Sequence, residues 1–504
     1  MPHLNYPQIP LFQFLIDAAN RNPTKIAIIC REKQLTYQEL LEKSKAFSLF
    51  LMHHGLVKND RVLISLWNVP EFAVAFYGTL MAGGIVTTAH PLSQPQDLSR
   101  LIADSGAKIL VAHSSVIASV DSLPQHLQPT LIIDIDTSEW EKACLPTLND
   151  GAFPNAQISS DDIAVLQYTG GTTGLPKGAI MLHRNLVVNA IQNAEWWRWE
   201  LSDVVVGVLT LVHTWGLCCC LNSVIYCGAT VILIPHFDPK EVIKSIENHH
   251  ATILYGSATM FHRLCNEFEQ NGGEVSSLRL VKAGAMLVPN HLVDRWKRIT
   301  GIPLRLGYGL TEASPETHNS PPDQPKSGSI GVPIFDTEAK IIDAEFPEKS
   351  LPIREIGELC VRGPQVGAGY WNQPEETEKV FVNGWLRTGD LAYQDEEGYF
   401  YLVDRIKDLI KYRGYSVFPA ELENILLQHP GVQDCLVVGE ADTEAGEIPV
   451  AHIVTNSDYP QYAREFLDYC AARISPLKTI RKVVFHSKLP RTPVGKGLRR
   501  KLKK

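Results

Sequence analysis

The chain has 504 residues, of which 45% are hydrophobic and 20% are charged, an ordinary composition for a globular protein. This length exceeds what one hydrophobic core supports, so at least two domains are expected. The formal net charge of −8 argues against a general nucleic-acid binder, because contacts to a phosphate backbone need a basic face.

The N-terminal region contains no pattern typical of a targeting segment. Its first residues lack a basic stretch followed by an apolar core, so no secretory signal is predicted. The most apolar segment, residues 72–86, contains three glycines and is too short to cross a bilayer, so it predicts a buried helix. The ten cysteines include no C-x-x-C pair, which predicts buried free thiols in a reducing cytosol and a cytoplasmic protein.

Short apolar runs typical of strands alternate with helical patterns through most of the chain, which predicts an α/β fold. Residues 37–53 form the clearest predicted helix, because their apolar positions recur at helical spacing. The predicted strands lie at 61–66, 108–112, 130–135, 204–209, 230–234 and 252–255. No internal repeat is evident.

The sequence becomes charged and rich in turn-forming residues from Asp404 onward. A compact series follows, with helices predicted at 420–428 and 461–474 and strands at 434–439, 448–455 and 482–486. His429-Pro430-Gly431 would end the first of these helices. We therefore predict two domains, 1–403 and 404–504, the second of normal domain size.

A loop rich in glycine and threonine, YTGGTTGLPKG at 168–178, resembles a phosphate-binding loop but does not match the usual sequence pattern. The common P-loop pattern is G-x-x-x-x-G-K-[ST], but Pro176 stands at the second glycine and Gly178 replaces the hydroxyl. The residues before the loop read as a strand, so its backbone N–H groups can form an anion nest at the end of that strand. The predicted phosphate contacts are Thr169, Gly170, Gly171, Thr172, Thr173, Gly174 and Lys177.

Read as a whole, this loop closely resembles the signature of the adenylate-forming superfamily: acyl-CoA synthetases, firefly-type luciferases and peptide-synthetase adenylation domains. The resemblance recurs in order through LTYQEL (35–40), LMAGG (80–84), LVHTWG (211–216), GYGLTE (307–312), GELCVRGP (357–364), WLRTGD (385–390), VDRIKDLIKYRG (403–414) and PRTPVGKG (490–497). It implies a large N-terminal domain of packed α/β subdomains and a small, mobile C-terminal α+β domain, with a hinge near 404–407.

The resemblance also implies which residues hold the nucleotide. In GYGLTE, Gly307, Tyr308 and Gly309 match the adenine-binding run, with Tyr308 covering the base. Thr311 matches an α-phosphate donor with a catalytic role, and Glu312 matches the Mg²⁺ ligand, since magnesium prefers a carboxylate plus substrate phosphates. Asp390 resembles the ribose ligand, because a carboxylate accepts bonds from both sugar hydroxyls. Arg405 resembles a second ribose contact.

Lys496, in PRTPVGKG, matches the catalytic lysine of the superfamily. When a carboxylate attacks the α-phosphorus of ATP the two anions repel, and a lysine between them supplies orientation and electrostatic stabilisation. Gly497 follows it where the family often has an apolar residue. Lys407 matches the hinge about which the small domain rotates before thiol attack, and Lys411 and Gly414 match the face that meets the thiol carrier.

The acyl pocket is implied by two further segments. His213, which also counts as a candidate catalytic residue, and Trp215 match its border, while Gly284, Ala285 and Met286 match its floor. Amino-acid-activating relatives carry an aspartate near this region, but LVHTWG has none, so a free amine would be buried unpaired at a cost of several kcal/mol. The apolar surroundings predict a fatty or an aryl acid.

The expected function is therefore that of an ATP-dependent carboxylic acid:CoA ligase, with a fatty acid as first expectation. It would form an acyl-adenylate, release AMP and pyrophosphate, and use ATP, Mg²⁺ and CoA. The alternatives are an aryl acid:CoA ligase, an acyl-AMP ligase that loads an acyl-carrier protein, a luciferase-like oxygenase and a non-catalytic nucleotide-binding protein. A NAD-dependent dehydrogenase is disfavoured because no G-x-G-x-x-G follows a strand. The basic tail, 491–504, suits the phosphates of CoA, peripheral contact with a membrane, or solvent.

Overall fold

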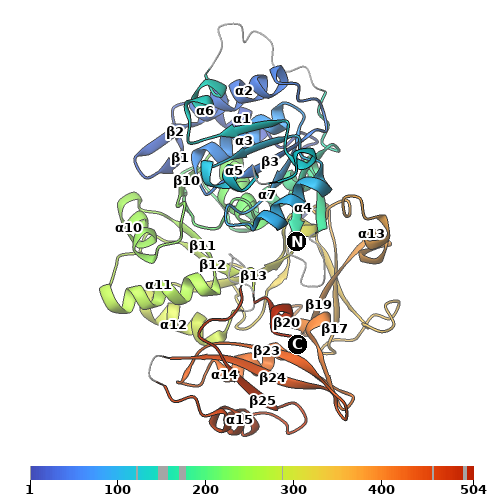
Figure 1. The fold of residues 1–504 in the computed structure, drawn as a ribbon. Helices are drawn as coiled ribbons and strands as arrows, with labels where there is room; N and C mark the ends of the chain where they lie inside the picture. Colours follow the sequence, from blue (N-terminus) through green and yellow to red (C-terminus); the bar gives the residue numbers. More distant parts are fainter. Residues whose placement is uncertain are drawn as a thin grey trace.

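Two mostly parallel sheets, with helices packed against them, form the N-terminal part of the molecule (Figure 1). The computed structural model describes residues 2–120, 123–145, 157–169, 177–286, 288–456, 459–491 and 497–503. The α/β class predicted from the sequence is confirmed, as is the small α+β unit after the larger part.

The first sheet has the strand order β6-β5-β3-β4-β7-β8, and all its pairs are parallel except β7 with β8. Its strands are β3 (Arg61–Ser65), β4 (Ile85–Thr88), β5 (Ile109–Ala112), β6 (Leu131–Asp134), β7 (Ile163–Thr169) and β8 (Lys177–Leu182). The accompanying helices are α1 (Gln13–Arg21), α2 (Tyr37–His53), α3 (Pro70–Met81), α4 (Pro95–Ser105), α5 (Ser114–Val120), α6 (Ser138–Ala143) and α7 (His183–Trp196). The predicted phosphate loop therefore joins two antiparallel neighbours of this sheet.

The second sheet has the order β15-β14-β13-β12-β11-β9-β10-β1-β2. Its strands are β1 (Ile26–Cys30), β2 (Lys33–Thr36), β9 (Val204–Gly207), β10 (Thr230–Leu233), β11 (Ile253–Ser257), β12 (Leu280–Gly284), β13 (Leu304–Gly309), β14 (Glu316–Asn319) and β15 (Val332–Pro333). Its helices are α8 (Thr214–Leu217), α9 (Ser223–Cys227), α10 (Pro239–His249), α11 (Ala258–Asn271) and α12 (Asn290–Thr300). Strands β11, β12 and β13 are parallel, so their carboxyl ends meet at one edge, the usual place for a ligand site in such sheets.

The local signals predicted most of these elements well. Helix α2 spans the predicted residues, and Thr36 and Glu39 form a capping box at its start, which satisfies otherwise unpaired N–H groups. Each predicted strand is present, and its ends lie within two residues of the prediction except for 434–439, which extends three residues further to Asp442. The apolar run 72–86 was predicted as one helix, and this was wrong for residues 82–86: α3 ends at Met81, and a glycine turn leads into β4. Gly83 takes a positive φ of 78°, which ends the helix.

A third sheet follows the two large ones in the chain. It contains β16 (Glu338–Ile342), β17 (Gly357–Arg362), β18 (Phe381–Val382), β19 (Trp385–Gln394) and β20 (Phe400–Arg405), with α13 (Pro374–Val380) beside it. Asp390 on β19 pairs in register with Arg405, the last residue of β20. The WLRTGD motif and the start of the predicted hinge are therefore neighbours across an antiparallel pair.

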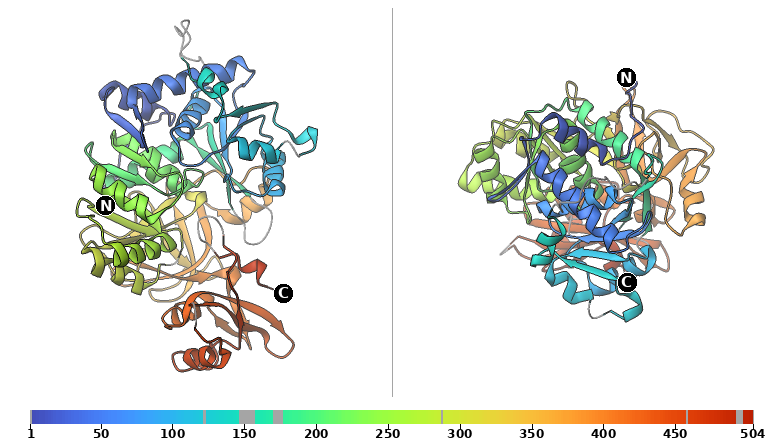
Figure 2. Two further views of the ribbon diagram at one scale, coloured as in Figure 1. Left: turned by 60° about the vertical axis from the view of Figure 1, so that its left-hand side comes forward. Right: turned by 90° about the horizontal axis from the view of Figure 1, so that it is seen from above.

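The C-terminal unit, orange to red, lies below the rest of the molecule in Figure 1 and in the left view of Figure 2. Its elements are β21 (Ile410–Tyr412), β22 (Tyr415–Val417), α14 (Pro419–Leu426), β23 (Val432–Asp442), β24 (Gly446–Thr455), α15 (Ala463–Ala471) and β25 (Lys482–Phe485). Its main apolar cluster is drawn from residues 410–485, separate from the clusters of the earlier sheets. The carboxylate of Asp404 accepts the backbone N–H of Ala420 at 2.8 Å, which attaches α14 to the end of β20.

All ten cysteines are described and none forms a disulfide, as predicted. Among the described residues, no helix is both long enough and apolar enough to cross a membrane.

Candidate active site

The GYGLTE motif spans the end of β13 and a short 3₁₀ turn, Thr311–Ala313. A Cβ atom at Gly309 would lie 2.1 Å from the carbonyl oxygen of Pro315, so the backbone can turn this tightly only at a glycine. The turn sets Thr311 and Glu312 directly after the carboxyl end of the strand. Both are half-buried, so their side chains are placed at the edge where ligands bind in parallel sheets.

Three residues from separate motifs meet beside this turn. The Tyr308 hydroxyl donates to Asp390 Oδ2 at 2.7 Å, and Arg405 Nε lies 3.0 Å from Asp390 Oδ1. Burial and the neighbouring Asp390 carboxylate raise the pKa of Tyr308 well above its ordinary value, so it stays a hydrogen-bond donor. An aromatic face, a carboxylate and a guanidinium thus form one polar cluster. Their roles in binding adenine and ribose remain predictions.

Glu312 belongs to a second cluster, which includes two residues that sequence reasoning missed. Tyr370 donates its hydroxyl to Glu312 Oε1 at 2.6 Å, and the Lys177 ammonium lies 5.1 Å above the centre of the Tyr370 ring. Lys177 also pairs with Glu376 at 2.6 Å, and this hydrogen bond, with a second from Lys379, lowers the pKa of Glu376 to about 2. The signal that was available is the G-Y-W run of residues 369–371, which was left unassigned.

The backbone of residues 367–371 explains why Tyr370 lies there. Ile180 on β8 donates to the carbonyl of Gly369 at 2.9 Å, and Trp371 donates to the carbonyl of Gly178 at 2.8 Å. Gly367 donates to the carbonyl of Glu312 at 2.8 Å. This segment therefore connects the strand that follows the phosphate loop to the turn that carries Glu312.

The predicted phosphate loop lies largely outside the described residues, which exclude Gly170, Gly171, Thr172, Thr173 and Gly174. Its two described ends face each other, because Thr169 and Lys177 are paired in the register of β7 and β8. The Thr169 hydroxyl donates to the carbonyl of Lys177 at 3.4 Å. The ends of the loop thus lie at the same place as the Glu312 cluster.

A magnesium ion that bridges nucleotide phosphates needs few protein ligands, because it keeps several waters and takes oxygens from the phosphates. Glu312 meets this requirement with a single half-buried carboxylate. The donor set therefore fits Mg²⁺ carried with a nucleotide.

The predicted acyl-pocket residues come from two elements. Trp215 is buried in α8, and a Cβ atom at Gly284 would lie 3.0 Å from the Trp215 ring. His213 caps α8, where its Nδ1 accepts the backbone N–H of Trp215 at 3.3 Å. Ala285 and Met286 follow the end of β12, with Ala285 exposed and Met286 half-buried. The structure thus brings His213, Trp215 and Gly284 together.

The expectation that this region lacks a carboxylate was wrong. Trp215 Nε1 donates to Glu316 Oε1 at 3.1 Å, and Glu316 is itself paired with Lys282. Both charged residues come from strands of the second sheet, Lys282 from β12 and Glu316 from β14, far from LVHTWG in the sequence. Sequence reasoning missed them because no local pattern marks the pair.

The residues predicted for the thiol half-reaction lie in the C-terminal unit. Lys407 lies in a 3₁₀ turn, Ile406–Asp408, directly after β20. Lys411 is exposed, and Gly414, with a φ of 83°, ends the tight turn between β21 and β22. Lys496 lies outside the described residues. The flanking residues Arg491 and Gly497 form a β-bridge with each other.

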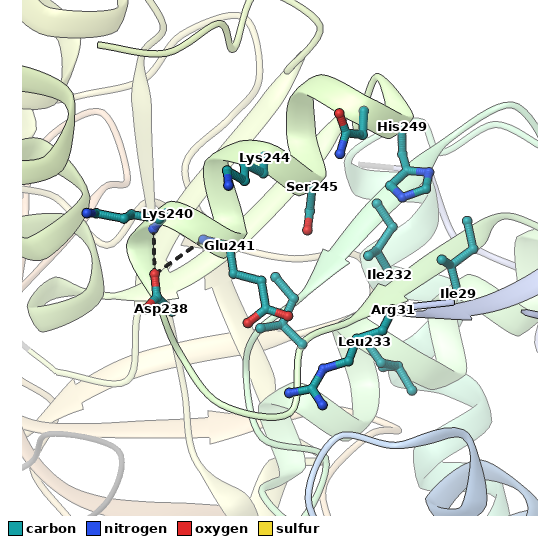
Figure 3. Close-up of a pocket in the computed structure, with 12 residues that line it drawn as sticks. Ile29, Arg31, Ile232, Leu233, Asp238, Lys240, Glu241, Lys244, Ser245 and His249 are labelled. Atoms are coloured by element: carbon teal, nitrogen blue, oxygen red, sulfur yellow. Dashed lines mark hydrogen bonds between the residues drawn. The ribbon is translucent and has the colours of Figure 1, made fainter. Parts of the chain in front are cut away.

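A pocket of about 470 Å³ lies elsewhere in the molecule (Figure 3). It is lined by β1, β10 and α10, with Arg31, Glu241 and Lys244 among its charged residues. Asp238 caps α10 by accepting the backbone N–H groups of Lys240 and Glu241. None of the predicted site residues lines this pocket.

His318 makes the region behind Tyr308 sensitive to acid. It is fully buried against Phe400, with no described partner for Nε2, and burial lowers its pKa to about 3. The unfolded chain, with a histidine pKa of about 6.5, therefore binds the proton first. The free energy of unfolding should fall as the pH drops from about 6.5 toward 3, by up to about 1.4 kcal/mol per pH unit from this residue.

We expect His318→Gln to remove this part of the acid sensitivity. Urea unfolding at pH 7 and pH 5 should show the variant losing about 2 kcal/mol less than the wild type over this interval. His183, whose burial lowers its pKa to about 4, is unchanged in both proteins and so cancels in the comparison. An identical loss in variant and wild type would show that His318 is not held neutral.

Comparison with known proteins decides the family. A model described as "AMP-binding enzyme" matches residues 15–371, and one described as "AMP-binding enzyme C-terminal domain" matches residues 421–496. The chain belongs to the AMP-binding enzyme family. This confirms the adenylate-forming superfamily as the one the sequence motifs resemble.

Its relatives include a long-chain-fatty-acid–CoA ligase of Bacillus subtilis (strain 168), 35% identical over all of this chain and 96% of that protein. The 4-coumarate–CoA ligase 2 of Oryza sativa subsp. japonica is 33% identical over 100% of this chain and 94% of that protein. Among solved structures, O-succinylbenzoate coenzyme A synthetase from Bacillus subtilis, in complex with ATP and magnesium ion, has a TM-score of 0.87 at 31% identity. That match covers 98% of this chain and 100% of the other.

Proposed function

We propose that the chain is an ATP-dependent carboxylic acid:CoA ligase, an AMP-forming acid–thiol ligase that works through an acyl-adenylate. The observation that carries the proposal is the convergence of Tyr308, Asp390 and Arg405 beside the turn that holds Thr311 and Glu312. The CoA ligases to which the chain is similar over its whole length support the same activity.

ATP would be held between these clusters. The Asp390 carboxylate accepts from the ribose hydroxyls, and Arg405 holds that carboxylate in position. Lys177 exchanges its Glu376 partner for the phosphates, and Thr311 donates to the α-phosphate. Magnesium, held through Glu312, would neutralise charge on the phosphates when bound.

The two half-reactions need different partners for the adenylate. In the first, the acid carboxylate attacks the α-phosphorus, pyrophosphate leaves, and Lys496 steadies the charge that develops. In the second, the thiol of CoA attacks the acyl carbon and AMP leaves. We propose that the unit 404–504 rotates about 404–407 between these steps, with Lys407 in the hinge and Lys411 and Gly414 on the face toward CoA. The separate core of residues 410–485 supports rotation as one body.

A fatty acid is the proposed substrate class, with an aryl acid as the alternative. The fatty-acid ligase of Bacillus subtilis supports the first and the 4-coumarate ligase of rice supports the second, at nearly equal identity. Apolar walls from Trp215 and from helix α8 suit either tail. CoA is the proposed acceptor in place of a carrier protein, and the ten free thiols support a cytoplasmic location.

A panel of carboxylic acids tests the function. Acetate, medium- and long-chain fatty acids, benzoates and cinnamates are scored for pyrophosphate release with Mg²⁺–ATP, with CoA, with a phosphopantetheinylated carrier protein, or with neither. We expect acid-dependent pyrophosphate release in every condition and thioester only with CoA. Thioester on the carrier protein alone would replace the CoA assignment, and no acid-dependent release with any acid would refute the ligase.

A further inference from the structure

The face of β12 that carries Gly284 also carries a buried lysine. Side chains alternate along a strand, so Leu280, Lys282 and Gly284 point to one side, while Val281 and Ala283 pack into the apolar cluster under α11 and α12. Gly284 faces Trp215 at the predicted floor of the acyl pocket. Lys282 precedes Gly284 by two residues, which places it about 7 Å away toward the start of the strand.

Lys282 and Glu316 form a buried ion pair at this depth, with side chains only 2% and 3% exposed. The Glu316 carboxylate is well provided with donors. Besides Lys282, its Oε1 accepts from Trp215 Nε1 at 3.1 Å and from the Cys219 thiol at 3.5 Å, and its Oε2 accepts from Asn319 Nδ2 at 3.0 Å. This network fixes the carboxylate in place and leaves it little capacity for a ligand.

The Lys282 ammonium, in contrast, has fewer hydrogen-bond partners than it has donors. It has three N–H donors, and Glu316 is its one oxygen partner among the described residues. The rings of Trp197, Trp215 and Tyr255 surround it, each with its centre 5.7 to 5.8 Å from Nζ. Aromatic faces attract the cation without taking its directed hydrogen bonds. Donors therefore remain for an oxygen brought in by a ligand.

Two further polar atoms at the same place also have no partner among the described residues. These are Asn319 Oδ1 and Trp197 Nε1, both in buried side chains. Gly307, whose own Cβ would lie 2.9 Å from Lys282 Nζ and 2.4 Å from Asn319 Oδ1, keeps this corner free of a side chain. A buried polar group without a partner costs free energy, so a polar ligand group is the natural complement.

We propose that Lys282, positioned by Glu316, donates a hydrogen bond to an oxygen at the far end of the acid. The enzyme would then select acids with a distal hydroxyl or carbonyl. This deepens the ligase function proposed above and rests on it. An all-hydrocarbon tail would cover the ammonium without bonding it, whereas a neutral oxygen accepts from it. A second carboxylate is disfavoured because Glu316 already neutralises the lysine. A buried ion pair seldom adds net stability, which agrees with a role in selection.

Matched acids that differ only by a distal oxygen test this proposal. Pyrophosphate release gives kcat/KM for benzoate against 4-hydroxybenzoate, cinnamate against 4-hydroxycinnamate, and octanoate against 8-hydroxyoctanoate. We expect the oxygenated member to be preferred by about ten- to hundredfold in at least one pair, as for a hydrogen bond to a charged group. The double variant Lys282→Met with Glu316→Gln should lose that preference, so that the oxygenated and the hydrocarbon member of the pair are used with similar kcat/KM.

A second ion pair on the same sheet supplies the control, with a buried Asp203 carboxylate and an Arg279 side chain that is 38% exposed. Arg279 and Asp203 lie at the opposite, amino-terminal ends of β12 and β9, with Arg279 Nε 2.8 Å from Asp203 Oδ1. Arg279→Met with Asp203→Asn should lower the melting temperature yet keep the wild-type preference. Ratios within threefold for every pair in the wild type overturn the inference whether or not any variant folds, as does a preference that survives in the Lys282 double variant. Absence of pyrophosphate release with all acids would refute the ligase function itself.

Discussion

Replacing Lys496 with alanine is expected to lower acid-dependent ATP–pyrophosphate exchange by about 100- to 1000-fold, the usual loss when one group that stabilises transition-state charge is removed. Thioester formation from supplied acyl-adenylate and CoA should stay near the wild-type rate. In that step the thiol attacks the acyl carbon and not the phosphorus, so the charge that Lys496 stabilises does not develop. The two rates, measured separately on one preparation, check this.

The matched control is Lys501→Ala, which removes another cation of the basic tail. Lys501 is exposed in the last 3₁₀ turn, Arg499–Lys501, and should leave both rates unchanged. Lys407→Pro should give the reverse phenotype, with exchange retained and thioester synthesis lost, because proline restricts the hinge dihedrals. If Lys496→Ala slowed both half-reactions equally, the lysine would serve the enzyme generally and not the adenylation step.

The sequence predicted those elements whose signals are local. Helix α2 begins at a capping box, and the predicted strands of the two large sheets are short apolar runs close to their predicted bounds. The apolar run 72–86 was overextended because hydrophobicity alone does not distinguish a buried helix from the buried parallel strand that follows it. The glycines within the run were the better signal.

The same distinction applies to the site residues: those in local motifs were predicted, and pairs between distant residues were missed. GYGLTE and WLRTGD are each an unbroken run of sequence that could be recognised as a motif. The structure brings Tyr308 of the first and Asp390 of the second into hydrogen-bond contact. The partners that sequence reasoning missed are all distant in the chain: Lys177 and Glu376 are 199 residues apart, and Lys282 and Glu316 are 34 apart. A lone lysine or glutamate in a strand carries no local mark of its partner. Such pairs depend on strand order and register, which composition and spacing do not determine.

Asp390→Ala is expected to weaken ATP binding by about 100-fold, because two ribose hydroxyls lose a charged acceptor. Asp390 is 6% exposed and holds both Tyr308 and Arg405, so the variant should also unfold at lower urea concentration. Asp395→Ala separates the two effects: Asp395 is 4% exposed and pairs with Lys326, but lies past the end of β19. It should lose comparable stability and keep its affinity for ATP.

Tyr308→Phe refines the same test, because it removes one hydrogen bond to Asp390 and keeps the aromatic face. We expect it to weaken ATP binding only about fivefold, the effect of a single hydrogen bond of about 1 kcal/mol. Calorimetric titration with ATP and Mg²⁺ measures all three variants. Since the carboxylate, and not the phenol, is proposed to hold the sugar, Asp390→Ala must be the weaker binder by a clear margin. Equal losses in the two variants would mean that Asp390 acts only by holding Tyr308 over the base.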